Sequence, residues 1–125
     1  MVVDSRAGAG GTIPTDVVAK SPPDGHNLVM GHAGPFVSAL TLYSKDLQYD
    51  PVKDFIPIAV FATSANLLLV HPSVPAKNAK EFIALVKKNP GKMNYSSSGS
   101  GSTQHLSGEM MKLLIKTDFT HIPYK

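Results

Sequence analysis

A loop of serine, glycine and threonine is the stretch of this sequence best suited to chemistry. It reads Ser97-Ser98-Gly99-Ser100-Gly101-Ser102-Thr103 and lies between a short apolar run and a segment with helical periodicity. Glycines allow a tight turn in which neighbouring backbone N–H groups can point together. The start of a helix adds unpaired N–H donors and a partial positive charge. The pattern therefore predicts an anion site, with hydroxyl groups as further hydrogen-bond partners.

The loop contains no lysine or arginine, which favours a carboxylate over a nucleoside triphosphate. A plain surface turn is the alternative interpretation, because most helix N-termini are capped without binding anything. Residues 6–11 form a second glycine-rich loop. Neither loop is a nucleotide-binding motif, since a dinucleotide fingerprint would need glycine at Ile13 or at Gln104, and no Gly-Lys-Ser/Thr sequence occurs.

A serine hydrolase is the enzymatic alternative, with Ser98 or Ser102 as nucleophile and His105 or His121 as base. The sequence marks no aspartate to orient such a base and contains no nucleophile elbow. We therefore expect a binding protein rather than an enzyme. Five scattered histidines and no cysteine give no recognisable zinc spacing, so no metal site and no cofactor are expected.

Composition limits the remaining classes of protein. The chain has 125 residues, 42% of them hydrophobic and 17% charged, as in one globular domain or two small lobes. The net charge is +3, and no aromatic residues interleave with the lysines, which argues against nucleic-acid binding. No apolar run reaches the roughly 20 residues of a membrane span, and no signal peptide is recognisable.

The loop must be positioned by alternating strands and helices. Apolar, β-branched stretches predict strands beginning at residue 2 and at 27–31, 56–61, 66–71, 93–95 and 119–122. Helices are predicted at 12–20, within 36–47, after an Asn78 cap, and behind the Ser/Gly loop. The last helix carries one apolar face of Leu106, Met110, Leu113 and Leu114. The order predicts an α/β fold with a largely parallel sheet, whose strand ends would hold both glycine loops.

Several segments follow one another in an order typical of a known family. They are residues 2–13, Pro22-Pro23-Asp24-Gly25, residues 49–55, Val70-His71-Pro72-Ser73 and residues 94–106. The series resembles the Bug family of periplasmic solute-binding receptors, also called tripartite tricarboxylate transporter substrate-binding proteins. The resemblance extends over essentially the whole chain.

The resemblance implies a two-lobed, Venus-flytrap receptor of about twice this length that closes on a small organic carboxylate. Its ligands would be di- or tricarboxylates, amino acids or aromatic acids, delivered to membrane permease subunits without catalysis. Residues 1–65 would belong to the first lobe and residues 66–125 to the second. The ligand-binding residues would be the Ser/Gly loop of Ser97, Ser98, Gly99, Ser100, Gly101, Ser102 and Thr103, the turn of His32, Ala33 and Gly34, and Thr63 at the crossover.

The departures from the family pattern are also expectations. The family's first strand with its Pro-Gly-Gly loop, its signal peptide and the rest of its second lobe lie outside these 125 residues. Ser5 and Ala7 replace a usual asparagine and proline, and Pro14 replaces a small residue. We expect a truncated receptor, periplasmic by family but cytoplasmic if expressed as given, that forms at least a dimer through unpaired sheet edges. The alternative is a self-associating remnant that binds no ligand.

Overall fold

The computed structural model describes residues 1–124. A short 3-10 turn, η1 (Ala9–Gly11), leads into helix α1 (Thr12–Ala19), and a π-helical turn, η2 (Gly34–Ser38), leads into helix α2 (Ala39–Leu42). The order then continues with helix α3 (Ala79–Lys88), strand β1 (Asn94–Ser97), helix α4 (Thr103–Ile115) and strand β2 (Thr120–Pro123).

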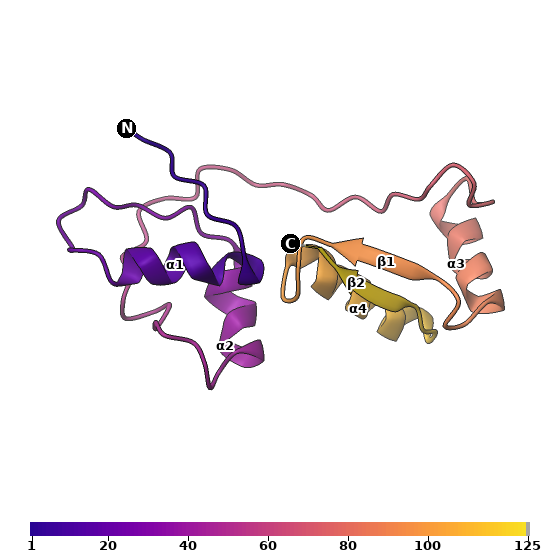
Figure 1. Cartoon of the computed structure of the whole chain (residues 1–125). Helices are drawn as coiled ribbons and strands as arrows, with labels where there is room; N and C mark the ends of the chain where they lie inside the picture. The colour runs from indigo at the N-terminus through magenta and orange to yellow at the C-terminus, as the bar shows by residue number, and fades with distance from the viewer. Residues whose placement is uncertain (125) are drawn as a thin grey trace.

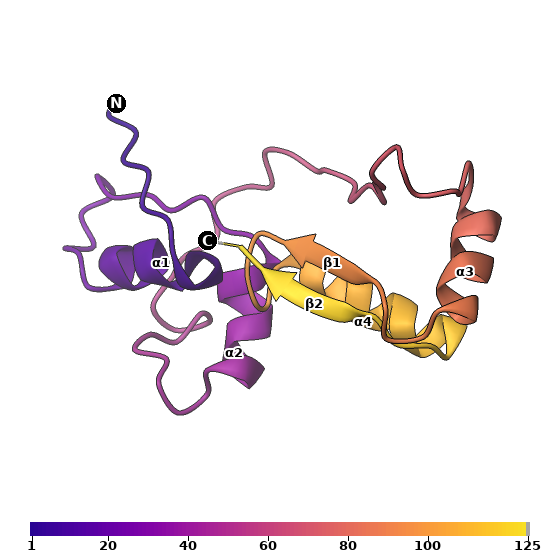
Figure 2. The same cartoon turned by 45° about the vertical axis from the view of Figure 1, so that its right-hand side comes forward.

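The elements form two groups joined by a long connection. Helices α1 and α2 lie together, and β1, β2, α4 and α3 lie together, while residues 56–73 run between the groups without helix or strand (Figures 1 and 2). The division of the chain into lobes at residues 65 and 66 stays a prediction.

The first group is built around the glycine-rich N-terminal loop. Pro14 is tolerated in the first turn of α1, where its missing N–H leaves no bond unmade. The buried Thr15 donates its hydroxyl to the carbonyl oxygen of Gly11 at 2.8 Å. The Tyr49 hydroxyl donates to the carbonyl oxygen of Pro35 at 2.7 Å, and Phe55 packs edge-on against the Tyr49 ring. These contacts fix residues 49–55 as a surface loop against η2.

The second group contains a β-α-β unit. Strands β1 and β2 pair in parallel, with Asn94 opposite Thr120 and Ser97 opposite Pro123, and α4 is the crossover between them. Parallel strands need such a crossover, because a tight hairpin can join only antiparallel ones. The predicted α/β class is confirmed, and so are the strands predicted at 93–95 and 119–122 and the helix after the Ser/Gly loop.

Helix α3 confirms the predicted cap. The side-chain oxygen of Asn78 accepts a hydrogen bond from the backbone N–H of Glu81 at 3.0 Å, and the Glu81 carboxylate accepts one from the N–H of Lys77 at 2.8 Å. The helix buries Phe82 and Val86 against Phe119, which precedes β2. Partly buried hydrophobic residues complete this core: Ala76, Met93, Tyr95, Met111 and Ile115.

Several predicted elements are absent. Residues 2–3, 27–31, 56–61 and 66–71 are not strands, although their composition favours strands. A strand exists only where a second one supplies its hydrogen bonds, and within residues 1–124 these four stretches have no such partner. The helix predicted within 36–47 ends at Leu42, after which the chain turns.

The apolar face that identified α4 is exposed to solvent. Leu113 is 80% exposed, and Leu106, Met110 and Leu114 are exposed as well. The side of α4 that packs on the core carries Met111 and Ile115 instead. No described helix combines the length and the apolar character needed to cross a membrane.

Candidate functional site

The Ser/Gly loop, residues 97–103, connects the carboxyl end of β1 to the N-terminus of α4 (Figure 1). Its last turn is an N-cap: the buried Ser102 hydroxyl accepts a hydrogen bond from the backbone N–H of His105 at 3.2 Å. Ser102 has the extended conformation typical of a cap, with φ −64° and ψ 159°. The positive end of the α4 dipole therefore points into the loop.

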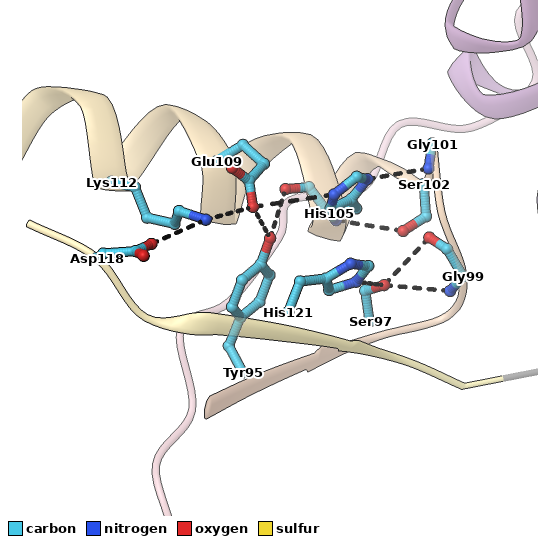
Figure 3. Close-up of polar contacts among 10 residues, drawn as sticks. All are labelled: Tyr95, Ser97, Gly99, Gly101, Ser102, His105, Glu109, Lys112, Asp118 and His121. Carbon is cyan, nitrogen blue, oxygen red and sulfur yellow. Dashed lines mark hydrogen bonds and ion pairs between the residues drawn. The ribbon is translucent and has the colours of Figure 1, made fainter. Parts of the chain in front are cut away.

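Three backbone donors of the loop are already used within the chain. The Gly99 N–H donates to Ser97 Oγ at 3.2 Å, and the Gly101 N–H donates to His105 Nδ1 at 3.0 Å (Figure 3). The Ser102 N–H donates to the carbonyl oxygen of Gly99 at 3.2 Å. The N–H groups of Ser98, Ser100 and Thr103 have no partner among residues 1–124. These three donors are therefore not used within the described part of the chain.

The hydroxyl groups of the loop have different surroundings. Ser97 and Ser102 are buried, whereas Ser98 and Ser100 are exposed. Ser98 Oγ donates to Gln104 Oε1 at 3.1 Å, and Thr103 Oγ1 lies 3.4 Å from Asn66 Oδ1. Ser100 makes no side-chain hydrogen bond among the described residues.

The structure brings three glycine-containing loops together. A Cβ atom added to Gly10 would lie 2.9 Å from the carbonyl oxygen of Ser100, and one added to Gly34 would lie 2.8 Å from the carbonyl oxygen of Gly10. His32 belongs to the same group, because its Nδ1 atom accepts the Gly34 N–H at 3.1 Å. The turn at residues 32–34, the N-terminal loop and the Ser/Gly loop therefore meet at one place.

Thr63 is exposed within residues 56–73, and among the described residues no hydrogen bond joins its side chain to this group. The residue of that connection that does reach the loop region is Asn66. Its amide nitrogen donates to Ser107 Oγ at 3.0 Å, beside the weak contact with Thr103. Asn66 carried no signal in the sequence, because its contact partners lie about forty positions further along the chain.

Two histidines, His105 and His121, stack on each other beside the Ser/Gly loop. The His105 and His121 rings stack with their centroids 4.0 Å apart and their planes 15° apart. His121 Nε2 lies 2.7 Å from Ser97 Oγ, and the Tyr95 ring lies next to His121 with a centroid distance of 4.9 Å (Figure 3). Burial lowers the pKa of His121, and the neighbouring His105 lowers it further.

A charged network extends along α4 from this pair. The Tyr95 hydroxyl donates to Glu109 Oε1 at 2.8 Å, and Lys112 bridges Glu109 at 3.0 Å and Asp118 at 3.2 Å (Figure 3). Burial raises the pKa of Tyr95, and its hydrogen bond to Glu109 raises it further. The hydrogen bond from Lys112, then that from Tyr95, lowers the pKa of Glu109. Glu109 is therefore an anion that orients its neighbours.

The predicted nucleophiles are not activated. Ser98 bonds to Gln104 and Ser102 caps α4, so neither is paired with a histidine side chain. The serine that does approach an imidazole is Ser97, whose hydroxyl also contacts the Gly99 carbonyl oxygen at 3.1 Å. Within residues 1–124 no three potential ligand side chains gather as a metal site would require. The arrangement offers donors for an anion and no catalytic triad.

Two surface hollows lie away from the Ser/Gly loop, one formed by residues around Val70, Pro75 and Glu81 and the other by residues around Thr12, Asp46 and Tyr49. The candidate site is the place where the three glycine-containing loops meet.

Similar folds occur in several solved structures. The structure superposes on a periplasmic transporter with a TM-score of 0.95 and 44% identity, over 99% of this chain and 41% of that one. It superposes on the adipate-bound Rpa4515 protein of R. palustris with a TM-score of 0.94 and 36% identity, over 99% and 41%. For malate-bound MatC of Rhodopseudomonas palustris the TM-score is 0.80 at 38% identity, over 94% and 40%.

These likenesses define the class: over the part that it spans, the fold is that of periplasmic binding proteins. The model of the family described as tripartite tricarboxylate transporter family receptor matches residues 1–125, and the chain belongs to this family. In Bordetella pertussis, relatives include a UPF0065 protein, 35% identical over 125 residues, and the protein BugT, 32% identical over 126 residues. Each match includes 100% of this chain, which spans only 38% of the length of either relative.

Proposed function

We propose that this chain provides one wall of a periplasmic receptor for small organic carboxylates. The observation that carries the proposal is the set of unpartnered N–H groups of Ser98, Ser100 and Thr103 at the N-terminus of α4. Hydrogen bonds to a charged group contribute roughly 1.5–3 kcal/mol each, so a few suffice to hold and orient a carboxylate.

The kind of ligand follows from the loop and from the structural neighbours. Adipate and malate, which two neighbours carry, are small dicarboxylates. The loop has no lysine or arginine, so recognition rests on backbone dipoles. The His32 turn and Gly10 adjoin the loop and would face the remainder of such a ligand. Delivery to membrane permease subunits and a periplasmic location belong to the same proposal and rest on the family.

The test removes one backbone donor. Thr103 is the first residue of α4, where proline fits a helix, and Ser102 already has the extended conformation that precedes proline. Thr103→Pro therefore removes the N–H while keeping the helix, and Thr103→Ala removes only the hydroxyl. We expect calorimetry with adipate or malate to show Thr103→Pro binding at least about tenfold more weakly than Thr103→Ala. Equal affinities for the two variants would refute the role of the backbone donor.

The exposed apolar face of α4 supports a second candidate, a self-associating chain that binds no ligand. Light scattering coupled to size exclusion, with and without C4–C6 dicarboxylates, separates the two. A melting temperature that rises with one acid supports the receptor, because a ligand at 100 times its dissociation constant stabilises by about 2.7 kcal/mol. An oligomer that responds to no acid supports the second candidate.

A further inference from the structure

The two stacked histidines are both linked to the Ser/Gly loop by hydrogen bonds. His105 Nδ1 accepts the N–H of Gly101, so in the neutral ring the proton is on Nε2. Through Ser97 Oγ, which accepts the N–H of Gly99, His121 is linked to the other buried glycine of the loop. Each imidazole therefore fixes one of two glycines, Gly101 and Gly99 (Figure 3). The exposed Ser100 lies between these glycines in the sequence.

Protonation acts differently on the two rings. A proton added to His105 can go only to Nδ1, where two N–H donors would then face each other and the bond to Gly101 would be lost. When His121 takes up a proton, its Nε2 atom can still donate a hydrogen bond to Ser97 Oγ, and the Ser97 hydroxyl can still donate to the carbonyl oxygen of Gly99. A charge on both rings would place two cations 4.0 Å apart.

The other ionisable groups around the pair come from β1 and α4. Tyr95 on β1 donates to the carbonyl oxygen of His105 at 3.3 Å and to Glu109. Glu109 on α4 lies 3.9 Å from His105 Nε2, and its charge is shared with Lys112. Among residues 1–124, Glu109 is the carboxylate that faces the pair, and Lys112 already neutralises it, which leaves little to compensate a second positive charge.

We propose that His105 and His121 are positioning residues that hold the donors of the Ser/Gly loop in place only while His105 is neutral, so that carboxylate affinity falls on acidification. The predicted change in carboxylate affinity rests on the proposed function. The predicted change in the NMR spectrum rests only on the structure of the loop. Added positive charge without loss of loop geometry would have the opposite effect, because it would attract the carboxylate more strongly.

The decisive experiment is an NMR titration of the chain in the absence of ligand. The Gly101 amide is expected to shift together with the His105 ring resonances, while the amide of Ala84 in α3 serves as reference. In His105→Asn, whose side-chain oxygen can replace Nδ1 as acceptor without titrating, the Gly101 amide should no longer respond. A Gly101 amide that ignores the His105 titration, or that still titrates in His105→Asn, overturns the proposal.

The second readout is the affinity for adipate between about pH 8 and pH 6. The parent chain should weaken by about tenfold, whereas a His105→Asn/His121→Gln variant should show a flat profile. Protonation of adipate itself is the same in both and cancels. Tighter binding by the parent alone at low pH overturns the proposal. If no protein binds adipate or malate even at high pH, the proposed function fails, and the NMR titration still decides the positioning role.

Discussion

The carbonyl oxygen of Ser100 lies directly against Gly10, so that a Cβ atom at Gly10 would be 2.9 Å away from it. Gly10 also has φ +63°, a conformation that L-residues with a side chain rarely adopt. The two glycine loops, distant in sequence, thus depend on one position that has no side chain.

Gly10→Ala should destabilise the fold and displace the Ser/Gly loop. Backbone strain and the close contact together should lower the free energy of unfolding by about 2–4 kcal/mol. Gly25→Ala is the matched control, because Gly25 has φ +79° with nothing within 4 Å and should cost only about 1 kcal/mol. Denaturant unfolding measures both, and equal losses would show that the contact with Ser100 contributes nothing.

Gly108→Ala should destabilise α4 even though alanine normally favours a helix. A Cβ atom at Gly108 would overlap the ring of Tyr95. The expected gain of about 1 kcal/mol in helix propensity is outweighed by an overpacking cost of about 1–3 kcal/mol. In a Tyr95→Ala background the same substitution should become neutral or stabilising. Thermal unfolding of the four variants gives the coupling, and additive effects would contradict the packing explanation.

Asn78→Ala should weaken α3 by about 1 kcal/mol, because it removes the oxygen that accepts the Glu81 N–H. Lys80→Ala, at an exposed position in the same turn, should change the free energy of unfolding by less than about 0.5 kcal/mol. Hydrogen exchange of the α3 amides localises the effect. Unchanged exchange in Asn78→Ala would show that packing of Phe82 and Val86 alone holds the helix.

Stability should fall as the pH decreases below about 6.5, the ordinary pKa of an unfolded histidine. Burial keeps the pKa of His121 lower in the folded chain, so the unfolded chain takes up the proton first. The resulting loss grows until the pH reaches the folded pKa. His121→Gln should flatten this part of the profile, and His26→Gln controls for the loss of one histidine. A profile that His121→Gln leaves unchanged would contradict the assignment.

Local signals in the sequence were sufficient for much of the fold. Asn78 with Glu81, Pro14 in a first turn, and the Ser/Gly loop before an apolar helix each act through neighbouring residues, and these elements form as predicted. The predicted strands at 27–31, 56–61 and 66–71 failed because pairing depends on a partner strand, which composition does not reveal.

For the candidate site, the sequence pointed to the Ser/Gly loop but did not reveal which of its backbone N–H groups are hydrogen-bonded within the chain. The Gly99 and Gly101 N–H groups were expected to face an anion, yet they bond to Ser97 and His105. The stacking of His105 on His121 and the contact of Asn66 with Ser107 depend on how α4 crosses the sheet. Such contacts join residues far apart in the sequence, and no spacing rule predicts them.

The β-α-β unit has a consequence for the order in which the chain folds. Its strands, helix and loop lie within one continuous stretch, so their contacts close short loops and can form early. The contact between Gly10 and Ser100 instead closes a loop that includes most of the chain, and the loss of conformational entropy is therefore greater. The Ser/Gly loop should therefore acquire its shape before the N-terminal loop reaches it, and lose that neighbour first when the chain unfolds.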